Sequence, residues 1–145
     1  MAHVVALIPD LLFGSQVKGA LTAAGHEVEL VADADRTRER LAGLIERAGL
    51  DATREDAGRE RGTGENARLG VLVVDLVDEN LHGAALVESF AAEGLLGQTR
   101  TLGFYSHVDA RAKERAEQAG FDLVVPRSRM AREGATLLTR LAEAA

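Results

Sequence analysis

The chain has 145 residues, 46% of them apolar, carries a formal charge of −6 and contains no cysteine. This length fits a single domain over residues 1–145, and the missing cysteines exclude disulfides, thiolate nucleophiles, iron–sulfur ligation and cysteine zinc sites. The acidic charge, the scarcity of aromatic residues and the short apolar runs argue against nucleic-acid and membrane partners, so we expect a cytoplasmic protein.

Short apolar segments with the character of strands alternate with segments of helical spacing. The predicted strands are Val4–Ile8, Glu27–Val31, Gly70–Asp75, Thr101–Ser106 and Leu123–Pro126. The predicted helices are Leu11–Ala24, Asp35–Ala48, Gly83–Glu93, Ala110–Ala119 and Met130–Ala144, with C-cap signals at Gly25, Gly49, Gly94 and Gly120. Strict alternation predicts an α/β fold in which a five-stranded, doubly wound parallel sheet forms the middle layer of a three-layer sandwich.

Residues 51–68 interrupt the alternation. Half of them are charged, and alanine is the only apolar residue type among them. Such a segment cannot bury enough surface to offset the entropy of ordering its chain. We therefore expect an exposed, mobile insertion between the second helix and the third strand, and a tolerated surface loop is the preferred interpretation.

Polar side chains close four of the predicted strands. Asp75 and Ser106 are the last residues of the third and fourth strands, and Asp10 and Arg127 follow the first and fifth. Open α/β sheets bind ligands at the carboxyl edge of their strands, so these four residues form the candidate site. Asp75, at the end of the most apolar strand, is the strongest candidate.

The chain resembles the receiver domains of bacterial two-component response regulators, which have a flavodoxin-like fold and are phosphorylated on an aspartate after the third strand. Asp75 and Gly83 keep the family's spacing between that aspartate and a glycine that opens the third helix. Ser106 matches the Ser or Thr that closes the fourth strand. Residues 119–122, Ala-Gly-Phe-Asp, resemble the family's turn before strand five, and the family's lysine then falls at Arg127.

Two departures from the family pattern affect the chemistry. Receivers hold a divalent metal with an acidic pair after strand one, whereas this chain has Pro9-Asp10, so at least one ligand is missing. The resemblance implies a weakened Mg²⁺ site with Asp10 and Asp75 as ligands, which Asp78 and Glu79 could partly complete. Arg127 is a wide planar donor in place of a compact ammonium group.

The resemblance implies a stand-alone signalling domain without enzymatic activity. Asp75 would be the phosphoacceptor, active or vestigial, with a sensor kinase or another signalling protein as partner. Signal would pass through Ser106 to the face made by residues 110–119, 123–126 and 130–144. The fifth strand lacks the family's aromatic residue, and Tyr105 is the nearest substitute. The same face is a candidate surface for a homodimer or for docking.

Other interpretations remain open. The chain could be a phosphorylation-independent interaction module in which Arg127 pairs with Asp75 in place of metal and phosphate. It could also be a flavodoxin-like domain that binds a flavin, because residues 13–16, Phe-Gly-Ser-Gln, resemble a phosphate-binding loop. Finally, Asp10 and Ser106 could simply cap the helices that follow them.

Overall fold

The computed structural model describes residues 2–58 and 70–143, and for residues 50–58 it describes the helical backbone alone. One sheet contains the strands β1 (His3–Leu7), β2 (Glu27–Val31), β3 (Gly70–Asp75), β4 (Arg100–Tyr105) and β5 (Leu123–Pro126). Their order is β2-β1-β3-β4-β5, and every neighbouring pair is parallel. The predicted α/β fold is confirmed.

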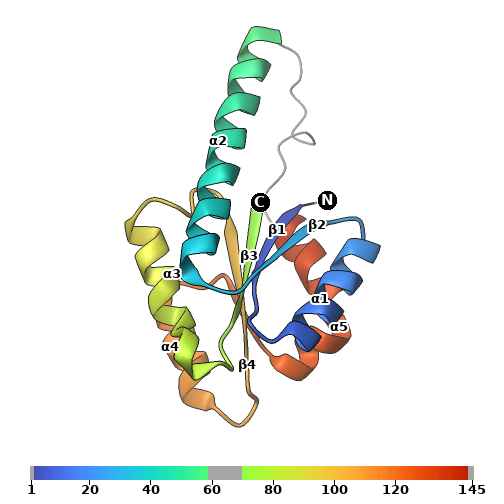
Figure 1. Ribbon diagram of the computed structural model, residues 1–145, viewed down its shortest axis with the longest axis vertical. Helices are drawn as coiled ribbons and strands as arrows, with labels where there is room; N and C mark the ends of the chain where they lie inside the picture. Colours follow the sequence, from blue (N-terminus) through green and yellow to red (C-terminus); the bar gives the residue numbers. More distant parts are fainter. Residues whose placement is uncertain (1, 59–69, 144–145) are drawn as a thin grey trace.

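Helices cover both faces of this sheet. They are α1 (Leu11–Ala23), α2 (Ala34–Gly58), α3 (Gly83–Ala92), α4 (Ala110–Ala119) and α5 (Arg127–Glu143), with a short 3₁₀ turn, η2 (Glu79–Leu81), before α3. Figure 1 shows α1 and α5 on one side of the sheet and α3 and α4 on the other. Because the strands are parallel, all the loops that lead from a strand into a helix lie at the same edge, the carboxyl edge.

The apolar residues separate into two clusters by strand alternation. Val71 and Val73 of β3 pack with α1 and α5, whereas Leu72 and Val74 pack with α2, α3 and α4. All six residues of β3 are buried, as expected for the central strand of a sheet that helices cover on both faces. Asp75 follows Val71 and Val73 in the alternation, so it belongs to the face that α1 and α5 cover.

Two predicted helix boundaries are wrong. Helix α2 continues through Gly49 to Gly58, since one glycine costs a helix only about 1 kcal/mol and the Ala, Arg and Glu that follow favour helix. Figure 1 shows this second half of α2 extending past the sheet. Helix α5 begins at Arg127, directly after β5, rather than at Met130. The first residues of the predicted 51–68 insertion are therefore helical, and the rest lie outside the described residues.

Within the described ranges, no helix is both long and apolar enough to cross a bilayer.

Candidate functional site

Asp75 is a buried carboxylate at the carboxyl end of β3. The residue is 5% exposed. Oδ1 accepts hydrogen bonds from the backbone N–H groups of Val77, at 2.8 Å, and Asp78, at 3.2 Å. Oδ2 accepts no hydrogen bond from the described part of the chain. One oxygen thus holds the loop after β3, and the other is left without such a contact.

The surroundings of Asp75 disfavour its charge. Burial raises the pKa of its carboxyl group, and the two backbone N–H groups offset only part of that effect. The neighbouring Asp78 carboxylate raises the pKa further, while the positive charge of Arg127 lowers it. A carboxyl group with a perturbed pKa at this edge of an α/β sheet is a candidate functional group.

The loop between Asp75 and α3 has little freedom. Asp78 Oδ1 accepts a hydrogen bond from Asn80 N at 3.0 Å, and His82 adopts the left-handed conformation at φ 54°. A Cβ atom on Gly83 would lie 2.7 Å from Val74 Cγ1. The first residue of α3 must therefore be glycine for the helix to approach the end of β3 this closely. This close approach is the physical reason for the spacing between Asp75 and Gly83.

Asp10 caps α1 and contacts Arg127. Its Oδ1 accepts a hydrogen bond from Phe13 N at 3.1 Å, and its Oδ2 lies 3.5 Å from Arg127 Nη2. Both carboxylate oxygens therefore have partners within the protein. The predicted capping role of Asp10 is confirmed.

Arg127 is held by two residues of the α1 region. Besides its ion pair with Asp10, its guanidinium carbon lies 4.3 Å from the centre of the Phe13 ring. The Phe13 ring in turn lies 5.1 Å from that of Phe104, the residue of β4 that faces Asp75 in register. Among the described residues, Asp75 has no ion pair within 4 Å, so the predicted pairing of Arg127 with Asp75 is wrong.

Sequence reasoning missed Phe13. A phenylalanine one turn into an amphipathic helix has the pattern of an ordinary core residue, and nothing local to it indicates a cation above its ring.

Ser106 directly follows β4, at the same edge as Asp75. It is half-buried, and its carbonyl accepts a hydrogen bond from Asp109 N at 2.8 Å. Leu102 and Phe104 belong to the cluster that packs with α1 and α5, so the alternation places Ser106 on the Asp75 side of the sheet. Its hydroxyl has no hydrogen bond to the described part of the chain.

The described acidic residues do not assemble a complete cage for a divalent cation. Mg²⁺ keeps several waters in near-octahedral geometry and is held by one or two carboxylates, so Asp75 and Asp10 are the side chains to consider. No group of three or more His, Asp or Glu side chains in residues 2–49 and 70–143 lies close enough together to hold a metal ion. Asp10 is occupied by its cap and by Arg127, and Asp78 caps the turn η2. The predicted completion of the site by Asp78 and Glu79 gains no support.

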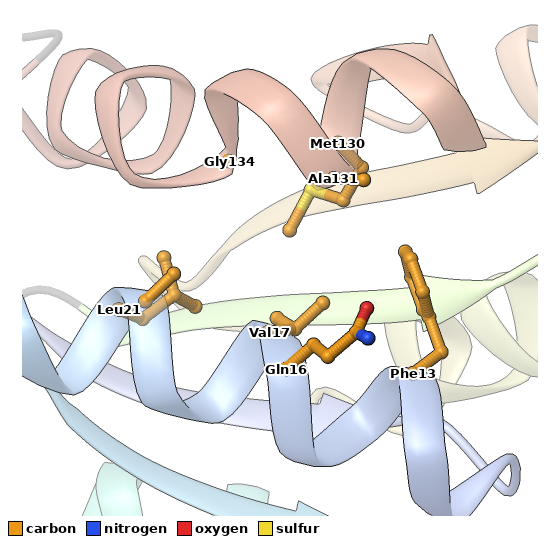
Figure 2. A pocket seen from close by; sticks show the side chains of 8 residues that line it. Phe13, Gln16, Val17, Leu21, Met130, Ala131 and Gly134 are labelled. Atoms are coloured by element: carbon orange, nitrogen blue, oxygen red, sulfur yellow. The ribbon is translucent and has the colours of Figure 1, made fainter.

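The flavin hypothesis also gains no support. The Phe13-Gly14-Ser15-Gln16 sequence lies inside α1, and a Cβ atom on Gly14 would lie 3.3 Å from Leu30 Cδ2 of β2. The segment is thus a packed helical turn and not a phosphate-binding loop. A cavity of about 30 Å³ lies between α1 and α5, far smaller than the several hundred Å³ that a small-molecule site occupies. Figure 2 shows Phe13, Val17 and Met130 lining this gap.

Comparison with known proteins reveals similar structures but no similar sequence. No protein-family model matches the chain, and a search of curated proteins finds no match. The receiver domain of the putative response regulator NarL from Mycobacterium tuberculosis has a TM-score of 0.68 at 18% identity, covering 99% of this chain and 98% of that one.

Chemotaxis protein CheY4 of Vibrio cholerae has a TM-score of 0.65 at 20% identity, covering 97% of this chain and 98% of that one. A putative pilus assembly protein, CpaE, from Burkholderia thailandensis has a TM-score of 0.66 at 17% identity, covering 99% and 100%. These likenesses confirm the predicted fold: the chain has the flavodoxin-like fold of response-regulator receiver domains.

Proposed function

We propose that this protein is an atypical receiver domain of intracellular signal transduction, in which Asp75 keeps the position of the phosphoacceptor but signalling does not depend on its phosphorylation. Output then occurs through contacts with other proteins in the cytoplasm. The fold, and the place of Asp75 at the carboxyl edge of its central strand, support the receiver-like part of this proposal.

The ion pair between Asp10 and Arg127 supports the second part of the proposal, that signalling does not depend on phosphorylation of Asp75. Phosphoryl transfer to a carboxylate brings anionic groups together, and receivers use a hard cation beside the acceptor to neutralise them. Here the acid after β1 gives one oxygen to the Phe13 N–H and the other to Arg127. Because Arg127 also stacks on Phe13, its guanidinium makes no ion pair with Asp75, although its charge still lowers the pKa of that carboxyl group. The cation that acts on Asp75 is therefore already engaged by Asp10 and Phe13, which weakens its ability to neutralise a phosphoryl group.

A working phosphoacceptor is the second candidate function. The observation that favours it is Asp75 Oδ2, which accepts no hydrogen bond from the described residues and could act as the nucleophile. Ser106, on the same side of the sheet, would then contact the phosphoryl group. In that case a sensor kinase or another phosphodonor protein would be the partner.

Intact-mass spectrometry after incubation with acetyl phosphate and Mg²⁺ distinguishes the phosphorylation-independent receiver from the working phosphoacceptor. We expect no mass gain in the wild-type protein, while a conventional receiver treated in parallel gains one labile phosphoryl group. A labile gain in the wild type that disappears in the Asp75→Ala variant would overturn the phosphorylation-independent proposal and establish the second candidate. Circular dichroism of both proteins controls for folding.

A further inference from the structure

His26 is a buried histidine at the amino edge of the sheet, opposite the edge that holds Asp75. It directly precedes β2 and is 4% exposed. Gly25, at φ 98°, turns the chain from α1 toward the strand, and His26 N donates a hydrogen bond to Leu21 O at 3.1 Å. The even-numbered residues of β2 pack with α1 and α5, so the imidazole belongs to that side of the sheet.

Both ring nitrogens of His26 have partners from distant parts of the chain. Nδ1 accepts a hydrogen bond from Ala2 N, directly before β1, at 3.1 Å. Nε2 lies 3.1 Å from the hydroxyl of Thr139, near the end of α5. Because a backbone N–H can only donate, Nδ1 carries no hydrogen, and Nε2 therefore carries it and donates it to Thr139 Oγ1. One neutral tautomer thus joins the start of β1 and the end of α5 to the start of β2.

A second proton on the imidazole would break this arrangement. It would add to Nδ1 and turn the acceptor for Ala2 N–H into a donor that faces another donor. Burial lowers the pKa of His26 below its ordinary value of 6.5, and the positive charge of the amino terminus lowers it further. The folded protein therefore keeps the ring neutral over part of the pH range in which the unfolded chain is already charged.

Charged groups lie near the ring without pairing with it. The groove that His26 lines also contains titratable or charged side chains from α1, β1, β2 and α2, namely Lys18, His3, Glu27, Glu29 and Arg47. Strand alternation places Glu27 and Glu29 on the α2 side of the sheet, away from the imidazole. In α5, the charged neighbours of Thr139 are Arg140 and Glu143. Among residues 2–49 and 70–143, no carboxylate lies within 4 Å of the ring to hold it in place once it is protonated.

We infer that His26 is a pH-sensitive clamp, which ties the end of α5 to the starts of β1 and β2 at neutral pH and loosens this joint when it is protonated in mildly acidic solution. The inference goes beyond the proposed function, because the clamp lies at the edge opposite Asp75 and needs no phosphoryl group. Its direction follows from the lowered pKa of His26. The contribution of the clamp to stability is complete above pH 6.5, where the unfolded chain is also neutral at this position, and declines as the pH falls below that value.

The imidazole nitrogens report the state of the clamp directly. Long-range ¹H–¹⁵N spectra of the ¹⁵N-labelled full-length protein, recorded from about pH 7.5 to about pH 5, distinguish the two neutral tautomers from the charged ring. We expect His26 at neutral pH to show a bare Nδ1 and a protonated Nε2, and to titrate at lower pH than the exposed His107. A tautomer with the hydrogen on Nδ1, or titration at or above the pH at which His107 titrates, would overturn the inference.

Amide hydrogen exchange tests whether protonation loosens the joint. After correction for the intrinsic pH dependence of exchange, the rates at Ala2 and at residues 137–141 should rise about fivefold or more between pH 7 and pH 5.5. His26→Gln offers a side-chain oxygen and an amide in place of the ring nitrogens and does not titrate, so its rise should stay below about twofold. His107→Gln is the matched control, because it removes an exposed histidine at the other edge, and it should show the full rise.

An equal rise in His26→Gln, or no rise in the wild-type protein, would contradict the clamp. If His26→Gln fails to fold, as circular dichroism would show, the titration of the wild-type imidazole still decides. Neither measurement uses a phosphodonor. Phosphorylation of Asp75 would thus contradict the proposed function while leaving the clamp intact, and a His26 ring that titrates freely would do the reverse.

Discussion

Asp75 and Asp122 accept similar hydrogen bonds at opposite edges of the sheet. Asp75 Oδ1 accepts the backbone N–H groups of Val77 and Asp78 at the carboxyl edge. Asp122 Oδ2 accepts the backbone N–H of Thr101, at 2.8 Å, and its hydroxyl, at 3.2 Å, at the amino edge. Each carboxylate thus holds two donors, and each lies next to a strand end.

The two differ in their access to water. Asp122 is exposed, so its second oxygen stays hydrated, whereas Asp75 is buried and burial raises its pKa. Asparagine at position 75 would accept the same two backbone hydrogen bonds without a buried charge. Folding therefore explains the carboxylate of Asp122 but does not require that of Asp75. A buried carboxyl group whose pKa is raised by its surroundings is a candidate functional group, in line with the receiver-like role proposed above.

The largest expected effect concerns the close packing beside Asp75. Gly83→Ala would place a Cβ atom 2.7 Å from Val74 Cγ1 and 3.0 Å from Leu76 Cδ2, so α3 must shift away from the Asp75 edge. We expect the free energy of unfolding in urea to fall by about 2 kcal/mol. Gly43→Ala is the matched control, because nothing lies within 4 Å of a Cβ atom there. It should be stabilising by about 0.5–1 kcal/mol, and equal losses in both variants would contradict this account.

The next effect concerns the amino edge. Asp122→Ala leaves the backbone N–H and the hydroxyl of Thr101 without their acceptor, and Thr101 is only 2% exposed. We expect a loss of about 1–2 kcal/mol in urea unfolding. Glu117→Ala, on the exposed surface of α4, should change stability by less than about 0.5 kcal/mol. Unchanged stability of Asp122→Ala would mean that Asp122 has no structural role, and the contrast with Asp75 would fail.

Much of the fold could be predicted because its signals are local. The apolar run of β3 and the glycines that end α1, α3 and α4 indicate strands and helix ends without reference to the rest of the chain. The Asp75–Gly83 spacing is likewise a local signal, because only glycine lets the start of α3 pack this closely against the end of β3. Gly49 misled the prediction, because a glycine between good helix formers weakens a helix without ending it.

The site was less predictable, because its contacts join distant residues. Whether Arg127 pairs with Asp75 or with Asp10 depends on the position of α5 relative to α1, and in the structure the guanidinium pairs with Asp10 and lies over the Phe13 ring. The exposure of Leu11 and Leu12 did have a local signal, however. The buried residues Phe13, Val17 and Leu21 define one face of α1, and the helical period places Leu11 and Leu12 outside it.

The smallest effect tests the cost of the buried charge. Asp75→Asn keeps the acceptor oxygen and removes the charge, so it should be stabilising at pH 7 by about 1 kcal/mol or less. Because folding raises the pKa of Asp75 above its ordinary value of 3.8, the penalty is complete above the folded pKa, shrinks as the pH falls through it, and vanishes below 3.8. Urea unfolding of both proteins from pH 7 to pH 3.5 should show the difference in stability closing. Asp122→Asn, measured alongside, should show no gain at pH 7. Destabilisation by Asp75→Asn at pH 7 would mean instead that the fold depends on the negative charge at position 75. Asp75 would then have a structural role, as Asp122 does.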